Sequence, residues 1–399
     1  MNLNYNFTDN SKKLTYGLMG GGLLLALIGA FTIHEHADTR VWANLLVNGF
    51  YFMAIALGAT FFIAVQFVAE AGWSAGLKRV PEAIMQYLPI GSLVVLICIL
   101  AGQFHLNHLY HWMDPNLYNP ESEHYDEVIA GKQGFFNPLF FWARILAYFV
   151  GWTLFMRAFR KRSLQEDLQE SFVKHRKSMD FAAWFLVFFA VTSSTMAWDL
   201  IMSIDTHWFS TLFGWYVFAG MFVTAITTII LTVIHLKEKG YFEHVNENHL
   251  HDLAKFMFAF SVFWTYLWTA QFLLIWYSDI PEEVTYYLDR WENYKVLWVL
   301  NLVVNFLFPF LVLMTRDAKR RWGTVKLVGY VIIIGHWLDV YIMVMPGTVK
   351  EHGSIGLLEI GMLLAFGGLF IFVILSSLAK APLVAKNYPF LEESKHHHV

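Results

Sequence analysis

Three ionisable side chains inside long apolar runs could move protons: Asp199, His336 and Asp339. A charged group within a membrane span is costly to bury, so each is a functional candidate by default. His336 and Asp339 are three residues apart and share one helix face, where a carboxylate can orient or charge an imidazole. We interpret them as a candidate proton relay. The alternative is that each is paired with a neighbouring helix and only fixes packing.

Further ionisable residues are expected where apolar runs end. Glu359, His105 and His108 fall at outer ends of the predicted spans, and Glu70 and His235 at inner ends. We include all five in the candidate proton pathway, with contact to interfacial water as the alternative for His105, His108 and Glu70.

Aromatic side chains are concentrated in the outer halves of three apolar runs between residues 180 and 278. Tryptophan and tyrosine are typical of the membrane interface. A flat apolar slot beside an acid and a hydroxyl is also what a quinone headgroup requires. Both interpretations stay open for the candidate quinone pocket, which comprises Trp198, Trp208, Trp215 and Tyr216.

The cysteine and histidine content argues against a redox centre in this chain. Cys98 is the single cysteine, which excludes a disulfide, a C-x-x-C-H haem site and an iron–sulfur cluster within this chain. A haem held by two histidines needs ligands at matching depth, and only His336 is near mid-membrane. We expect no haem and no metal, although four outer-end histidines could approach one another: His34, His105, His108 and His111. The histidines at 396–398 are expected to form a flexible tail.

The elements that must position these residues are transmembrane helices. The chain of 399 residues is 57% hydrophobic and 15% charged, against roughly 45 to 50% and 25% in soluble proteins. Apolar runs of about 20 residues match a hydrocarbon core of roughly 30 Å, and the alternation of barrel strands is absent. We predict an all-α integral membrane protein with no cleavable signal peptide. Its ten spans are 14–34, 42–70, 83–107, 138–158, 180–203, 210–236, 254–278, 295–315, 324–345 and 354–379.

The distribution of basic residues predicts that both ends of the chain lie in the cytoplasm. Cytoplasmic loops carry an excess of Lys and Arg. Of 28 such residues, the outer segments hold only Arg40, Lys132, Arg144, Arg290, Lys295 and Lys350. The net charge of −3 does not favour nucleic acid; lipids are the expected surroundings.

Two outer segments are acidic, around residues 114–127 and 279–292. The loop at 108–137 is longer than structureless loops usually are. It is either solvated surface or a face that docks a partner.

A weak internal repeat relates "MAWDLIMS" (196–203) to "HWLDVYIMVM" (336–345). Spans two to five and six to nine are therefore predicted to be equivalent four-helix units, since parallel repeats are a known membrane plan. We divide the chain into a tail with the first helix (1–40), two four-helix bundles (41–208 and 209–346), and the tenth helix with a cytoplasmic tail (347–399).

The stretch "WDLIMSIDTHWFSTLFGWYVFAG" (198–220) resembles the large membrane subunits of bacterial alternative complex III, a quinol oxidase. The length, ten spans and "HWLDVYIMVMP" (336–346) are most similar to the ActF family of membrane subunits in that complex, within the wider NrfD or polysulfide-reductase membrane family. The resemblance implies two tandem four-helix bundles flanked by two helices, in the bacterial inner membrane.

The resemblance also implies partners and a function. The partners are a sister NrfD-like membrane subunit, an iron–sulfur subunit, multihaem and monohaem c-type cytochrome subunits, and a terminal oxidase. Those partners would hold haem c and iron–sulfur clusters, while this chain would hold no cofactor and at most menaquinone. The chain would contribute proton transfer and assembly to a menaquinol:electron-acceptor oxidoreductase, with no catalytic residue of its own. The alternatives are an independent secondary transporter, which predicts broken helices at mid-depth, and a structural scaffold.

Overall fold

The computed structural model describes residues 4–33, 36–168 and 172–398. His34, one of the outer-end histidines, lies outside these ranges. The described residues form helices and connecting segments and no strands, and ten helical segments are long and apolar enough to cross a membrane. This confirms the all-helical architecture of the described residues, and the ten long apolar helices agree in number with the predicted spans and are compatible with a multi-pass membrane protein. The ten segments are α1 (Asp9–Thr32), α2 (Ala37–Val68), η1 to α4 (Ala75–Gln103), α6 (Pro138–Glu166), α7 with η5 (Phe172–Ile204), α8 (Leu212–Glu238), α9 (Glu247–Ser278), α11 to α12 (Lys295–Val312), α14 with η7 (Trp322–His352) and α15 (Leu357–Leu378).

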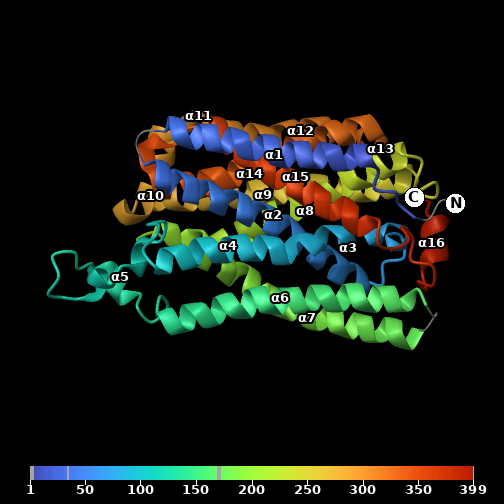
Figure 1. Cartoon of the computed structure of the whole chain (residues 1–399), viewed down its shortest axis with the longest axis horizontal. Helices are drawn as coiled ribbons and strands as arrows, with labels where there is room; N and C mark the ends of the chain where they lie inside the picture. The colour runs from blue at the N-terminus through green and yellow to red at the C-terminus, as the bar shows by residue number, and fades with distance from the viewer. Residues whose placement is uncertain (1–3, 34–35, 169–171, 399) are drawn as a thin grey trace.

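Shorter helices lie between and within the spans, and the two chain ends meet at one end of the bundle (Figure 1). We call this end, which carries α16, the terminal end, and the opposite end, which carries α5 and α10, the loop end. The shorter elements are α3 (Arg79–Ile84), α4 (Leu88–Gln103), α5 (Glu127–Gly131), α10 (Pro281–Asn293), α11 (Lys295–Leu302), α12 (Phe308–Val312), α13 (Arg316–Arg320) and α16 (Leu391–Lys395).

Several helices continue beyond the predicted spans at the terminal end. Helix α6 ends at Glu166 rather than near 158, α7 begins at Phe172 rather than near 180, and α9 begins at Glu247 rather than near 254. The apolar pattern marks only the part of a helix that matches the hydrocarbon core. The polar turns beyond it carry no such pattern, although their residues are compatible with a helix.

Helices α2, α8 and α14 form the centre of the bundle. In their most apolar windows 78%, 89% and 72% of residues are buried, against 22% in α1. Helix α2 packs against α4, α7, α8 and α14. A helix that is apolar on all sides and enclosed by others is the expected core element.

Helices α1 and α15 pack together through small residues at matched spacing. Gly22 and Ala26 on α1 lie against Gly361 and Ala365 on α15, and Gly29 lies against the backbone of Leu358 at the start of α15. A Cβ on Gly361 would lie 2.7 Å from the carbonyl oxygen of Gly22. Such seams let membrane helices approach closely enough for extensive van der Waals contact. Helix α15 is continuous through Gly367 and Gly368.

The eighth span contains a π-helical segment, Val303–Leu307, between α11 and α12. Pro309 follows this segment directly. Proline has no N–H, and its ring collides with the carbonyl four residues earlier, so the preceding turn must widen. The wider turn includes Asn305, whose role is described below.

The small-residue seam predicts unequal effects of two similar substitutions. Gly361→Ala forces α1 and α15 apart, so we expect a loss of about 1 to 3 kcal/mol of stability, seen as a lower thermal unfolding midpoint in detergent. Gly367→Ala is the matched control because its nearest atom would be 3.7 Å away, on Phe52. Equal midpoints for the two variants would contradict the seam.

Candidate proton site

Asp339 on α14 is 2% exposed and lies among neutral hydrogen-bond donors from three other helices. The Tyr216 hydroxyl (α8) donates to Oδ1. The Asn301 amide (α11) donates to the same oxygen at 2.8 Å, and the Trp264 indole N–H (α9) donates to Oδ2 at 3.0 Å. Four spans thus meet at one carboxyl group.

The π-helical segment and a glycine hold Asn301 in place. The amide of Asn305, within the wide turn, donates to Asn301 Oδ1 at 2.6 Å. A Cβ on Gly335 would overlap the Asn305 amide oxygen, so α14 can approach the wide turn only with glycine at this position. The local backbone irregularity therefore orients a donor of the Asp339 carboxyl.

His336 lies one turn from Asp339, with its Nδ1 3.7 Å from Asp339 Oδ2. It is 2% exposed, and neither ring nitrogen has a hydrogen-bond partner within the described ranges. A cavity of about 20 Å³ is lined by His336, Asp339, Gly220 and Thr224, among others. That volume suits one water molecule, which could connect the imidazole to the carboxyl group.

A second cavity of about 20 Å³ lies on the loop-end side of Asp339. Its lining includes Tyr216, Asn301, Gln271 and Arg290. Gln271 Oε1 and Arg290 Nε have no partner in the part of the chain that the structure describes, so a water here would have polar neighbours. Buried polar atoms and adjacent small cavities therefore lie on both sides of Asp339.

Arg290 separates this second cavity from the surface of the loop end. Its Nη2 is 3.1 Å from Oδ2 of Asp205, whose side chain is 19% exposed. Burial raises the pKa of the Asp205 carboxyl, and the neighbouring Arg290 offsets only part of this rise. The Asp205 carboxyl group, whose pKa is raised, thus lies at the boundary between the loop-end surface and the interior.

Asp199 on α7 has a different environment, dominated by Arg144 of α6. Arg144 makes two hydrogen bonds to the carboxylate, at 2.9 and 2.7 Å, and the Tyr148 hydroxyl donates at 2.7 Å. The guanidinium carbon also lies 3.9 Å from the ring centroid of Phe135. Asp199 is thus held in a buried ion pair with Arg144, and the Tyr148 hydroxyl adds a third hydrogen bond.

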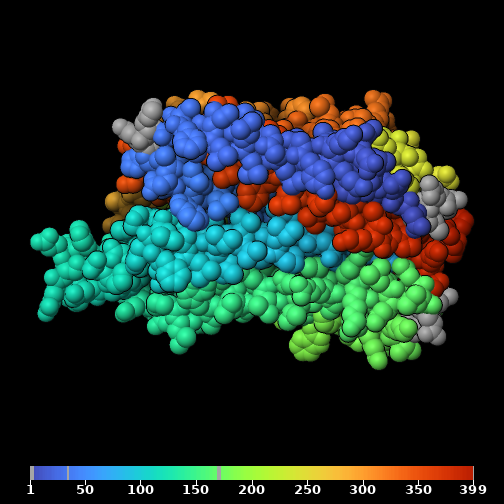
Figure 2. All heavy atoms as spheres, viewed as in Figure 1, coloured from blue at the N-terminus to red at the C-terminus, as the bar shows by residue number. Residues whose placement is uncertain are grey.

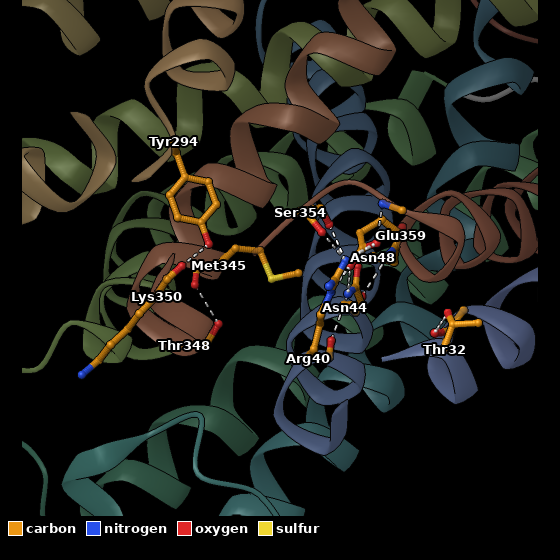
Figure 3. A network of polar contacts seen from close by, with 12 residues as sticks. Thr32, Arg40, Asn44, Asn48, Tyr294, Met345, Thr348, Lys350, Ser354 and Glu359 are labelled. Carbon is orange, nitrogen blue, oxygen red and sulfur yellow. Dashed lines mark hydrogen bonds and ion pairs between the residues drawn. The ribbon is translucent and has the colours of Figure 1, made fainter. Parts of the chain in front are cut away.

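Glu359 is also held as an ion pair, at the loop end of α15 (Figure 3). Arg40 of α2 donates to both carboxylate oxygens, at 2.7 and 2.9 Å, and the Asn44 amide donates at 2.9 Å. The Gly356 N–H donates to Oε2 at 2.8 Å, which caps the N-terminus of α15. Glu359 thus joins α2 to α15.

The other candidates for the proton pathway lie at the ends of the bundle. His105 and His108 are exposed at the loop end, around a hollow of about 470 Å³. Glu70 is exposed just after α2, and His235 is partly buried near the terminal end of α8. The structure does not bring these four residues to Asp339.

The aromatic candidates do not share one cavity. Tyr216 bonds Asp339, whereas Trp208 stacks on Tyr286 with ring centroids 3.9 Å apart. Trp198 is partly buried on α7, and Trp215 is 58% exposed. The two cavities beside Asp339 hold water-sized volumes, far below the several hundred Å³ of ordinary ligand pockets.

A network of buried charges at the terminal end was not predicted as a site. Glu82 accepts from Arg79 and Arg160, each at 2.7 Å, and Lys78 lies 3.1 Å from Glu166. The sequence interpretation treated the basic members only as markers of topology. The available signal was the Arg79 and Glu82 pair, which is spaced for contact on one helix face.

The C-terminal histidines also differ from the expected flexible tail. His397 Nε2 lies 2.7 Å from Asp252 Oδ2 of α9, and the Asn246 amide donates to the His397 carbonyl at 2.9 Å. Within the described ranges no group of three or more His, Cys, Asp or Glu residues could hold a metal ion.

Comparisons with known proteins do not assign the chain to a family. No protein-family model matches the sequence, and no curated protein is significantly similar to it.

The Arg144 and Asp199 pair predicts a charge-dependent stability effect. Arg144→Gln leaves a buried carboxylate without its cation, so we expect a loss of about 3 to 5 kcal/mol in thermal or denaturant unfolding in detergent. The double variant Arg144→Gln/Asp199→Asn carries neither charge and is expected to recover most of the loss. A double variant no more stable than Arg144→Gln would contradict the interpretation.

Proposed function

We propose that this chain is a cofactor-free membrane subunit of a quinol:electron-acceptor oxidoreductase, of the ActF type that belongs to alternative complex III. In this proposal Asp339 and His336 bind and release protons. One observation carries the proton role: among the buried carboxylates that the structure describes, only Asp339 lacks a Lys or Arg partner. The five others and their partners are Glu82 with Arg79 and Arg160, Glu166 with Lys78, Asp199 with Arg144, Asp252 with Lys255, and Glu359 with Arg40.

Neutral donors make Asp339 suited to exchange protons. Protonation of a carboxylate clamped by arginine would leave a buried cation uncompensated, at a cost of several kcal/mol. Protonation of Asp339 would leave no lysine or arginine without a counter-charge, because its partners Tyr216, Asn301 and Trp264 are uncharged at neutral pH. His336, at 3.7 Å, can accept or return a proton directly or through water.

The proposed topology places the terminal end in the cytoplasm. The first bundle would comprise α2, α4, α6 and α7, and the second α8, α9, α11 to α12, and α14, with α1 and α15 outside. Asp199 and Asp339 would be equivalent residues on the last helix of each bundle. Each carboxyl group accepts a hydrogen bond from a tyrosine, but Tyr148 lies on the third helix of the first bundle and Tyr216 on the first helix of the second, so the two tyrosines are not equivalent.

The partners in this proposal dock at the loop end. The segment 104–137 projects beyond the rest of the molecule (Figure 2) and exposes Glu121, Glu123 and Glu127. An acidic projection offers electrostatic complementarity to a basic partner surface. Iron–sulfur and cytochrome c subunits would carry the electrons, and a sister membrane subunit would bind menaquinol.

An independent secondary transporter is the second candidate. The π-helical segment beside Asn301 favours it, because irregular backbone at a buried polar site is common in transporters. A transporter would act without partners, whereas the proposed subunit would not. A structural scaffold would neither transport a substrate nor transfer protons.

The first experiment isolates the chain gently from its native membrane and identifies what accompanies it. The proposal predicts co-purification of multihaem cytochrome and iron–sulfur subunits, together with quinol oxidation. A colourless, solitary and stable protein would refute the complex and favour the transporter.

The proton role predicts a selective effect of Asp339→Asn. We expect proton translocation by the reconstituted complex to fall at least about tenfold, as for loss of a proton-transfer group, with haem content unchanged. Asp180→Asn, which removes an exposed carboxylate from α7, is the control. Unaltered translocation in Asp339→Asn with intact assembly would refute the proton role and leave the scaffold.

A further inference from the structure

Helices α6 and α7 form a peripheral pair with a continuous exposed face. On α6, Leu146, Val150 and Leu154 are 53%, 53% and 59% exposed, and Arg157 and Lys161 continue the same stripe at helical spacing. In the view of Figure 2, no other element covers α6.

Helix α7 repeats this arrangement beside α6. Trp184, Val187 and Val191 are 71%, 64% and 65% exposed, and Arg176 and Lys177 lie two turns closer to the terminal end. Arg162 Nη1 donates to the Lys177 carbonyl at 3.3 Å, so the basic turns of the two helices adjoin. We call Arg157, Lys161, Arg176 and Lys177 the basic rim, and the exposed apolar side chains beside it the apolar face.

The charges of this helix pair are segregated. Glu166 points inward to Lys78 and Ser178, and Asp167 to Arg79. The charged side-chain groups of the basic rim form no ion pair or hydrogen bond with any described residue. Among the described residues of this surface the exposed carboxylate is Asp180, so the rim has an excess of positive charge.

The rim lies at the depth of lipid headgroups. Helix α6 has 29 residues, a length of about 43 Å, which exceeds a hydrocarbon core of roughly 30 Å. The apolar face accounts for the part within the core, and the basic turns extend past it. Basic clusters at this depth attract anionic headgroups, at about 1 kcal/mol for each Lys or Arg.

We propose that this surface binds an anionic phospholipid whose phosphates lie at the basic rim and whose acyl chains lie along the apolar face. Four cations on two helices, none of which forms an ion pair with a described residue, fit a headgroup with two phosphates, as in diphosphatidylglycerol. The bound lipid stabilises α6 against the bundle, and α6 carries Arg144 and Tyr148, the partners of Asp199. An acidic polypeptide would match the rim alone and leave the apolar face unused.

The test is a lipid titration of the full chain in detergent by native mass spectrometry, with thermal unfolding in parallel. The probes are diphosphatidylglycerol, phosphatidylcholine, inorganic phosphate and polyglutamate. The variant is Arg157→Gln/Lys161→Gln/Lys177→Gln. The matched control, Lys13→Gln/Lys239→Gln/Arg321→Gln, removes three exposed charges elsewhere at the terminal end.

We expect diphosphatidylglycerol to bind and to raise the unfolding midpoint, with at least about tenfold weaker binding in the rim variant and no change in the control. Equal losses in both triple variants would show a general surface-charge effect and overturn the proposal. Tighter binding of polyglutamate, or full competition by inorganic phosphate, would also overturn it. Circular dichroism of both variants verifies that they are folded.

Discussion

Burying a carboxylate among apolar helices costs several kcal/mol unless a cation or several donors face it. This constraint accounts for much of the arrangement of the bundle, because its buried acids join different helices. Glu359 ties α15 to α2 through Arg40, Asp199 ties α7 to α6 through Arg144, and Glu82 ties α3 to α6 through Arg160. Each of these three carboxylates has at least one cationic partner, so its buried negative charge is compensated.

Asp339 meets the same constraint without a cation. Three neutral donors from α8, α9 and α11 stabilise its charged form. Its neutral form would leave no lysine or arginine without a counter-charge. The π-helical turn before Pro309 contributes by placing Asn305 against Asn301. A single backbone irregularity thus helps to position a donor for the buried carboxyl group that has no Lys or Arg partner among the described residues.

Apolar packing supplies the rest of the architecture, in two forms. Where helices meet, as in α1 and α15, small residues allow close approach of the backbones. Where helices face outward, as in α6 and α7, large apolar side chains remain exposed and only the basic turns interrupt them. The first surface is complete within the chain, whereas the second is left exposed by the described residues.

The amino-acid sequence was sufficient to predict the number and approximate position of the ten long apolar helices, because a helix that crosses a bilayer needs about 20 apolar residues. It also identified Asp199 and Asp339 as ionisable residues inside apolar runs, and Glu359 as one at the outer end of the tenth predicted span. The sequence could not show which of these acids is paired with a cation. Asp199 is bound by Arg144 and Glu359 by Arg40, whereas Asp339 is bound by the neutral Asn301, and all three partners are distant along the chain. The sequence interpretation treated Arg40, Arg144 and Lys78 as loop charges because a side chain that turns inward has no local signature. Which acids are paired with cations emerged only from the folded chain, because that pairing depends on which helices pack together.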